Sequence, residues 1–237
     1  MAIEDFDYIL YKFKEREFIF YKDLTTKEID RFLYEGCLPM FDDFLGEKFL
    51  IKLHFERSII YPLIINPGKT VRRNSKKYKI SIDYDFDGVY RGVTNQFKDI
   101  CWFKPQLYEK IKPLICNKES LSSFHSFEVW NANNELVAGD IGVVIGSRYL
   151  SMTGFYSESG AGTVLLYCIG KILDKFNFEV WDLGMDLPYK ERLGAMVISR
   201  KKFLDLVKLT RKTKISLKKE IFNCADLLNE IDIRDLL

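Results

Sequence analysis

Two aspartates inside otherwise apolar segments are the residues best placed to do chemistry. Asp140 lies between glycines in the segment LVAGDIGV, and Asp182 lies in FEVWDLGM. Strand alternation puts Asp182 on the same face as Phe178 and Val180, where an unpaired carboxylate would be costly. Each acid is therefore either a buried hydrogen-bonding partner or a functional group in a cleft. The residue pattern alone leaves both interpretations open.

A run of cations could bind phosphate. It contains no acid and consists of Lys69, Arg72, Arg73, Lys76, Lys77 and Lys79. Such charge binds a nucleic-acid backbone with a strong salt dependence, although charge runs are more often solvated loops. A second basic region runs from Arg200 to Lys219, in a chain whose net charge is only +2. Two basic regions in a nearly neutral chain favour an anionic partner.

A glycine-rich turn, Gly160-Ala161-Gly162-Thr163, precedes a predicted helix. Glycines allow close approach of the backbone, and a helix N-terminus presents free N–H groups to an anion such as the pyrophosphate of coenzyme A. No Lys-Ser/Thr pair follows the turn, which excludes a nucleotide-hydrolysing P-loop. A plain strand-to-helix turn is the ordinary alternative.

Histidine and cysteine patterns exclude several further classes. His54 and His125 are the only histidines and fit no triad or metal pattern, which argues against a Ser-His-Asp hydrolase. The five cysteines form no CxxC pair, so the sequence predicts neither a disulfide framework nor a zinc site.

The composition is that of a globular protein. The 237 residues are 47% hydrophobic and 30% charged, which excludes a disordered chain. No apolar run reaches the length of a membrane helix, and the first residues resemble neither a secretory signal nor a transit peptide. We therefore expect a cytoplasmic protein with no membrane partner.

The order of predicted elements indicates two domains of α+β class. Thr25 and Glu28 predict a capped helix that ends at Gly36, and Lys104-Pro105 opens another. The remaining predictions are strands around 50–65, 78–86, 127–130, 136–145, 148–155 and 178–183, a helix after Gly160, and a helix over 199–210 capped by Ser199. We place a small N-terminal α/β domain at 1–115 and a C-terminal domain at 116–237.

Several ordered motifs resemble the leucyl/phenylalanyl-tRNA–protein transferase family. The resemblance begins at Asp23-Leu24-Thr25, with the helix to Gly36, and extends to Phe203, and its most specific part is HSFEVW followed by LVAGDIGVVIG. Further matches are LPMF at 38–41, Trp102, Asp182, LGA at 193–195, and Arg200 with Phe203. The family resemblance implies an acetyltransferase-like (GNAT-like) C-terminal domain that needs no metal or coenzyme. It also implies transfer of an amino acid from aminoacyl-tRNA to a protein's N-terminal α-amine, which marks the protein for N-degron degradation.

The sequence departs from the family pattern at the expected site. The family's GESMFS is replaced by Ser151–Ser157, SMTGFYS, so its glutamate is missing. Gly184 replaces the glutamine two residues after Asp182, Met40 replaces the loop tryptophan, and Asp140 stands where the family has an apolar residue. The chain is thus expected to be a divergent branch.

The resemblance implies roles for particular residues. Asp182 would orient or deprotonate the attacking amine, and the backbone near Ser151 would form the oxyanion site. The aminoacyl pocket would be formed by Asp140, Met152, Phe155 and Met185. The tRNA would contact Trp102 and Met40 at its terminal adenine, and Lys69, Arg72, Arg73, Lys76 and Lys77 along its acceptor stem.

The identity of the transferred amino acid stays open at this point. The family resemblance favours Leu or Phe as the transferred amino acid. The Asp140 carboxylate, however, would pair well with the side chain of an arginyl donor, or with a basic N-terminal residue of the acceptor protein. Two other classes are alternatives: a coenzyme A-dependent acyltransferase that uses the Gly160–Thr163 turn, and an inactive tRNA-binding module. We expect a monomer whose partners are aminoacyl-tRNA and protein N-termini.

Overall fold

The computed structural model describes residues 10–43 and 46–229, which form two β-sheets and their covering helices. The small sheet has the order β1-β3-β2, from β1 (Phe18–Tyr21), β2 (Leu38–Asp42) and β3 (Lys48–Lys52). The large sheet has the order β10-β4-β9-β8-β7-β6-β5-β11. Its strands are β4 (Glu56–Ile60), β5 (Lys79–Ile82), β6 (Ser123–Trp130), β7 (Leu136–Ile145), β8 (Arg148–Tyr156), β9 (Val180–Gly184), β10 (Met196–Ser199) and β11 (Ile221–Asn223).

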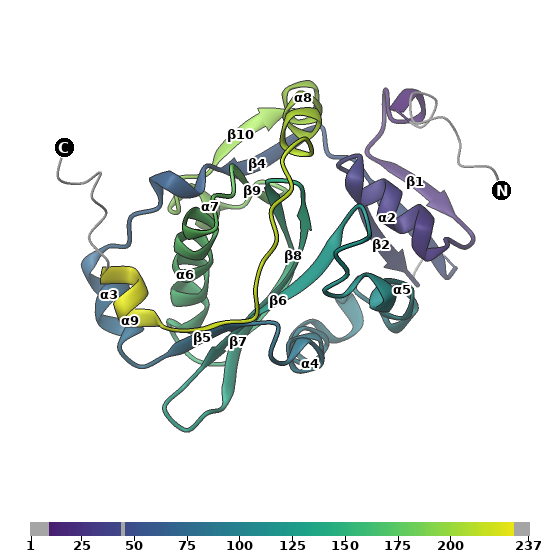
Figure 1. The fold of residues 1–237 in the computed structure, drawn as a ribbon. Coiled ribbons are helices and arrows are strands. Elements are labelled where there is room, and N and C mark those ends of the chain that lie inside the picture. The colour runs from purple at the N-terminus through teal and green to yellow at the C-terminus, as the bar shows by residue number, and fades with distance from the viewer. Residues whose placement is uncertain (1–9, 44–45, 230–237) are drawn as a thin grey trace.

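Helices connect and cover these strands (Figure 1). They are α2 (Thr26–Tyr34), α3 (Lys69–Ser75), α4 (Phe86–Phe97), α5 (Pro105–Ile111), α6 (Ala161–Lys175), α7 (Pro188–Glu191), α8 (Arg200–Thr210) and α9 (Cys224–Asn229), with short 3-10 turns at Pro62–Ile64, Lys98–Ile100 and Lys112–Leu114. Within the described residues, none of these helices is long and apolar enough to cross a membrane.

Local sequence signals explain the clearest elements. The predicted capping box of α2 is confirmed, because the Thr25 side chain accepts from the Glu28 amide while the Glu28 side chain binds the Thr25 amide. The antiparallel succession β6–β7–β8 follows the predicted strands closely. Ser199 precedes α8 as predicted, but its side chain makes no capping hydrogen bond.

Two segments differ from the sequence expectation. The apolar stretch around 50–65 is split between β3, in the small sheet, and β4, which pairs with β9 and β10 in the large one. The basic run is not a loop. It forms α3, whose Ser75 is buried, and then β5.

The large sheet spans the predicted division at residues 115 and 116. Strand β4 pairs with β9, and β5 pairs with β6, so segments from both sides of that point share one sheet. A core cluster also joins Phe41 and Phe49 of the small sheet to Ile141 and Leu150 of the large sheet. The pattern change near residue 116 is therefore not an edge of the large sheet. The sequence could not show this, because strand pairing between distant segments leaves no local signal.

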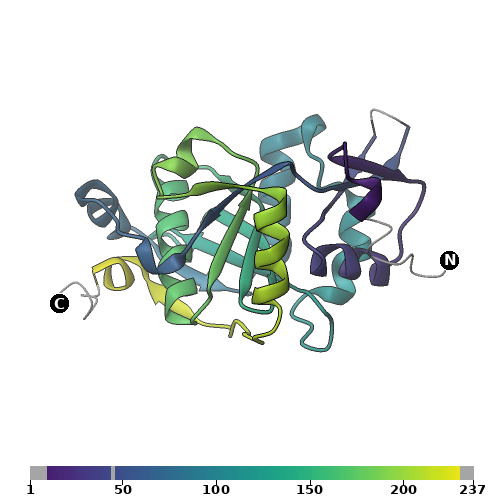
Figure 2. The same cartoon turned by 90° about the horizontal axis from the view of Figure 1, so that it is seen from above.

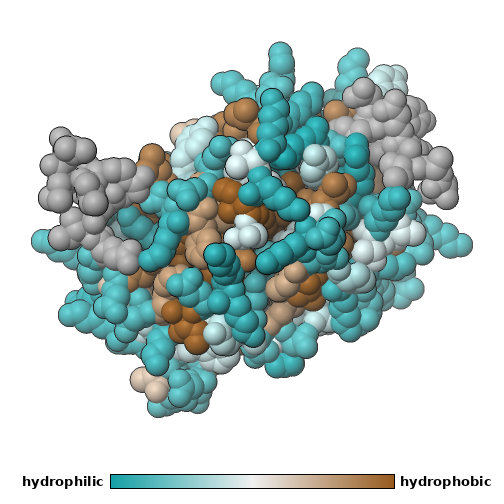
Figure 3. All heavy atoms as spheres, viewed as in Figure 1, coloured by the Kyte–Doolittle hydropathy of each residue, from teal (hydrophilic) through white to brown (hydrophobic). Residues whose placement is uncertain are grey.

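The small sheet, α2 and α5 lie at one end of the molecule, and α3 and α9 lie at the other (Figures 1 and 2). Helix α6 covers one face of the large sheet, and the segment after α8 crosses that face to reach β11 (Figure 1). Hydrophilic side chains dominate the surface in this view, with apolar ones showing near its middle (Figure 3). The strands between these two ends carry the buried polar residues described next.

Candidate active site

Asp182, on β9, is held by two arginines from the neighbouring strands. Its Oδ1 accepts from Arg57 Nε at 2.7 Å, and its Oδ2 accepts from Arg57 Nη2 at 3.0 Å and from Arg148 Nη1 at 2.8 Å. The backbone amide of Gly184 donates to Oδ1 at 3.0 Å. The Asp182 carboxylate is therefore fully buried and engaged on both oxygens.

This pairing keeps Asp182 ionised. Burial opposes its charge, but the two guanidinium groups outweigh burial and hold the pKa of Asp182 below its ordinary value. The ring of Phe203 lies against both guanidinium groups, 4.7 Å from Arg57 and 5.6 Å from Arg148. A carboxylate with this many partners can orient neighbouring groups, but it has little capacity to take up a proton.

Two further basic residues surround the arginine pair. Arg57 donates to His54 Nδ1 at 2.6 Å; burial and the Arg57 charge lower the pKa of His54 to about 2, so the imidazole is neutral. Lys190, from α7, donates to the carbonyls of Leu183 and Met185 at the end of β9, at 2.5 and 2.6 Å. Burial lowers the pKa of Lys190 to about 8.

Asp140 forms a second buried polar group on β7. Its Oδ1 accepts from Tyr149 Oη at 2.8 Å and from Ser151 Oγ at 3.1 Å, and Trp181 Nε1 donates to that same Ser151 hydroxyl at 2.9 Å. Burial raises the pKa of Asp140 to about 7, and its two hydroxyl partners only partly offset burial. Asp140 is thus poised to change protonation near neutral pH.

A strand irregularity lies beside this group. Ile141 pairs with Thr153 and Gly142 pairs with Ser151, so Met152 is an extra residue on β8 without a partner in that register. Bulges of this kind are common next to active sites because they change the direction of a strand and interrupt its ladder. The bulge at Met152 lies within the predicted oxyanion segment from Ser151 to Gly154.

The four predicted pocket residues do not lie together. Met152 and Phe155 pack into the core cluster on the α4 side of the sheet, and the Phe155 ring lies against Gly92. Asp140 points to the other side, where its partner Tyr149 packs with Phe127 and Phe178. Met185 lies beyond the end of β9 and is half exposed. Alternation puts Phe155, the neighbour of Gly154, on the side opposite to Asp140, and the bulge at Met152 brings Met152 to the same side as Phe155.

The structure places Met40 and Trp102, the two residues predicted to bind the terminal adenine, on neighbouring segments of the chain. The backbone amide of Phe41, next to Met40, donates to the carbonyl of Trp102 at 3.1 Å. Both Met40 and Trp102 are partly exposed and pack on the same core cluster. The structure thus brings the LPMF segment and Trp102 to one place at the end of the molecule that holds the small sheet.

The predicted phosphate-binding residues lie at the other end, on and just after α3. Lys69, Arg73, Lys76 and Lys77 are exposed. Arg72 is instead a structural residue: it donates to the carbonyl of Pro67 at 2.9 Å, to the carbonyl of Leu228 and to the side chains of Asn66 and Asn229. Arg72 fixes α9 against α3.

Sequence reasoning missed Arg57, Arg148, Lys190, Tyr149 and Trp181 as parts of these groups. Strand alternation could have indicated Arg57, since it lies in the apolar run ERSII. Arg148, Tyr149 and Trp181 carried no separate signal, because their role depends on which strands pair.

Taken together, the fold and the site define a mixed α+β protein in which buried ionic groups and a strand bulge lie in the middle of one large sheet. Comparison with known families is consistent with an acyl-transfer enzyme. The family model described as leucyl/phenylalanyl-tRNA protein transferase matches residues 59–208, well over half of the 237-residue chain. The chain therefore belongs to this family of transferases, as the sequence motifs indicated.

Individual relatives of this chain carry the same description as the family model. A leucyl/phenylalanyl-tRNA–protein transferase of Legionella pneumophila (strain Lens) is 27% identical over 192 residues, which cover 80% of this chain and 83% of that protein. One from Solidesulfovibrio magneticus is 27% identical over 194 residues, covering 80% and 76%. Among solved structures, L-PGS from Bacillus licheniformis aligns with a TM-score of 0.41 and 10% identity, covering 88% of this chain and 70% of that one.

Proposed function

We propose that this protein transfers an aminoacyl group from aminoacyl-tRNA to the N-terminal α-amine of a protein. The observation that carries the proposal is the family match over 59–208, a range that includes Trp102, Asp140, Ser151 and Asp182. The lost family glutamate and glutamine do not remove the buried acid, which keeps two arginine partners.

The reaction is aminolysis of an ester. The amine nitrogen of the acceptor attacks the carbonyl carbon of the aminoacyl ester, the bond to the ribose oxygen breaks, and a proton passes from the amine to that leaving oxygen. An α-amine has a pKa near ~8, so part of it is already neutral at pH 7. Holding the two reactants in place therefore supplies much of the acceleration.

Each polar group has a proposed part in that positioning. Asp182 acts as a positioning residue, since its oxygens are committed to Arg57, Arg148 and the Gly184 amide. This replaces the expectation that Asp182 deprotonates the amine. Backbone N–H groups in the irregular segment around Met152 are the proposed oxyanion donors, since the single hydroxyl hydrogen of Ser151 is donated to Asp140.

The finer specificity depends on Asp140. Leu or Phe is the proposed donor, by family membership, and Asp140 then receives a basic N-terminal residue of the acceptor. An arginyl donor is the second candidate, and one observation favours it: within the described residues the hydrogen bonds of buried Asp140 come from hydroxyl groups, and the more distant Lys190 offsets burial only in part, so a guanidinium would supply a direct charge partner.

The remaining parts of the proposal concern context. We propose that the large sheet is acetyltransferase-like. This is supported by β8 and β9, which precede and follow α6 in the chain and pair in parallel. We also propose that the protein acts as a monomer in the cytoplasm, and that transfer marks acceptors for N-degron degradation.

A transfer assay tests the function directly. Purified protein is incubated with separately labelled Leu-, Phe- and Arg-tRNA and with peptides that begin with Arg, Lys, Asp or Glu. We expect Leu or Phe on the peptides that begin with Arg or Lys. Asp140→Met, which restores an apolar residue, should reduce that transfer at least tenfold, whereas Asp205→Asn, at an exposed acid on α8, should leave it unchanged.

The other outcomes discriminate between the alternatives. Arg transferred to peptides that begin with Asp or Glu would assign Asp140 to the donor side chain. Bound tRNA with no transfer from any donor would contradict the enzymatic proposal and support a tRNA-binding module. Acyl transfer from acetyl-coenzyme A instead of tRNA would assign the Gly160–Thr163 turn to that cofactor.

A further inference from the structure

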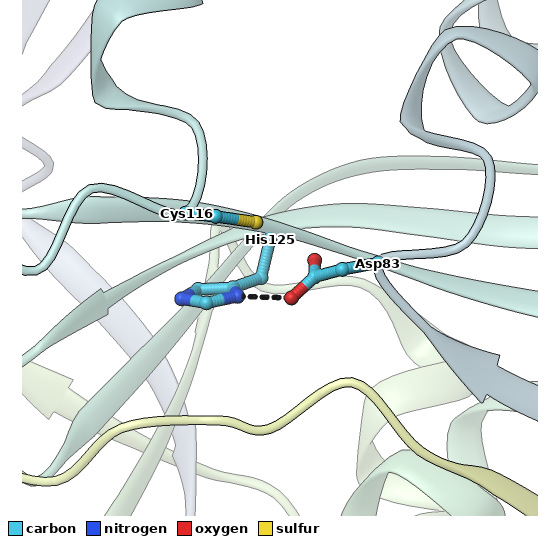
Figure 4. A group of neighbouring side chains, drawn as sticks. All are labelled: Asp83, Cys116 and His125. Carbon is cyan, nitrogen blue, oxygen red and sulfur yellow. Dashed lines mark hydrogen bonds and ion pairs between the residues drawn. The ribbon is translucent and has the colours of Figure 1, made fainter.

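We propose that Asp83, Cys116 and His125 form a binding site for a divalent transition metal ion of the zinc type. One carboxylate oxygen, one thiol sulfur and one imidazole nitrogen from these residues all lie within 4.8 Å of one another (Figure 4). The sequence predicted no zinc site because the three residues are far apart in the chain and form no CxxC pattern. The inference goes beyond the proposed transfer function and does not rest on it.

Backbone hydrogen bonds bring the three residues to one level of the sheet. Cys116 donates its amide to the carbonyl of Phe124 at 2.9 Å, on one side of His125 in β6. On the other side, the Asp83 amide donates to the carbonyl of Ser126 at 3.0 Å, and the Asp83 side chain accepts from the Ser126 amide at Oδ1, at 2.9 Å. The two neighbouring segments thus bracket His125.

Two of these residues hold an uncommon backbone conformation. Asp83 has φ 60° and Cys116 has φ 51°, in the left-handed region that non-glycine residues seldom adopt. The local structure is therefore strained at the two positions that direct a carboxylate and a thiol toward the imidazole of His125.

The side-chain directions suit chelation rather than nucleophilic catalysis. His125 Nδ1 lies 2.7 Å from Asp83 Oδ2, and in Figure 4 Nε2 points away from both Asp83 and Cys116. A nucleophilic cysteine would need the imidazole nitrogen that is not paired with the acid, as in a triad. Here a single ion can replace the proton shared by Nδ1 and Oδ2, with the Cys116 sulfur as its third ligand.

The donor set selects the metal. Thiolate and imidazole are ligands of zinc and related ions, whereas calcium and magnesium prefer oxygen alone. Bond lengths of about 2.0–2.3 Å would require the Nδ1–Oδ2 pair to open slightly. Three protein ligands leave a fourth position for water, and the exposure of Cys116 gives the ion access from solvent.

Neighbouring charges bear on the affinity. The thiolate rather than the thiol is the metal ligand, so the ion must displace the proton of Cys116 when it binds. The charged groups that act on this thiol from nearby are Asp83, Glu128 and Lys219.

The test uses Co²⁺ as a spectroscopic probe. The full chain is treated with a chelator under reducing conditions and titrated with Co²⁺. We expect a thiolate-to-cobalt charge-transfer absorption in the near ultraviolet that Zn²⁺ removes by competition. Asp83→Asn, His125→Asn and Cys116→Ser should each weaken Zn²⁺ binding at least about tenfold, and Cys116→Ser should remove the absorption.

Cys101→Ser is the matched control, since it removes another thiol outside the group, and it should leave the absorption and the affinity unchanged. Zn²⁺ should also raise the midpoint of thermal unfolding of the wild type and of Cys101→Ser, but not of Cys116→Ser. Three results would each overturn the proposal: no charge-transfer absorption in the wild type, an absorption that survives Cys116→Ser, or equal Zn²⁺ affinity in all variants.

Discussion

At the scale of single residues, Asp140 is the clearest departure from the family pattern. The family motif that the sequence resembles is expected to have an apolar side chain there, whereas this chain has a buried acid that accepts hydrogen bonds from the hydroxyl groups of Tyr149 and Ser151. The sequence identified Asp140 because an acid between glycines in an apolar strand is rare. Its partners could not be predicted, since Tyr149 and Ser151 face Asp140 only because β8 pairs with β7 in this register.

Asp140 should make stability depend on pH. Burial raises its pKa to about 7, so between pH 4 and 7 the folded protein holds a proton that the unfolded chain has lost. The free energy of unfolding therefore falls as the pH rises through this window, by up to about 4 kcal/mol at and above pH 7. Asp140→Asn removes this loss and keeps an oxygen for Tyr149 and Ser151. The gain of the variant over the wild type, measured by urea unfolding, should be larger at pH 8 than at pH 5.

Asp205→Asn, at an exposed acid, is the control for that experiment and should show no such change between the two pH values. Burial also lowers the pKa of Lys190 to about 8. Because Lys190 titrates in both the wild type and Asp140→Asn, most of its effect on stability cancels in the difference between the two proteins. An Asp140→Asn difference that is equal at pH 5 and pH 8 would show that Asp140 does not titrate in this range.

At the scale of elements, the sequence predicted the helices and hairpins that depend on neighbouring residues, and it missed the contacts that depend on which distant strands pair. The capped helix α2, the hairpin of β6 and β7, and the helix after Gly160 follow from side-chain patterns and turn residues. The ionic group that joins β4, β9 and β8 through Arg57, Asp182 and Arg148 does not, because no short-range pattern shows that these strands are neighbours.

Breaking that ionic group should destabilise the sheet. Asp182→Asn leaves Arg57 and Arg148 buried with their charge uncompensated, and loss of one partner from such a group typically costs about 3–5 kcal/mol. Urea unfolding of Asp182→Asn measures the loss, against Asp205→Asn as an exposed control that should change by less than about 0.5 kcal/mol. Unchanged stability of Asp182→Asn would show that this ionic group does not hold the three strands together.

At the scale of the whole molecule, the two parts of the predicted tRNA site are far apart. Trp102 and Met40 lie with the small sheet at one end, and α3 lies at the other (Figures 1 and 2). The ionic group of β4, β9 and β8 lies between them. A ligand that contacts both ends must be long, which suits an aminoacyl-tRNA whose terminal adenine and acceptor stem occupy different parts of one protein.

The salt dependence of tRNA binding tests whether α3 contributes. Each phosphate contact steepens the fall of log K with log salt concentration by about 0.7–0.9. Arg73, Lys76 and Lys77 are exposed and make no ion pair recorded within the described residues, so replacing all three by Ala should reduce the slope by about 2. The same triple change at Lys201, Lys202 and Lys208, exposed cations of α8, is the matched comparison and should leave the slope nearly unchanged. If the α8 variant lowers the slope and the α3 variant does not, the acceptor stem lies along α8, and the Lys69–Lys79 run is a solvated surface that does not contact tRNA.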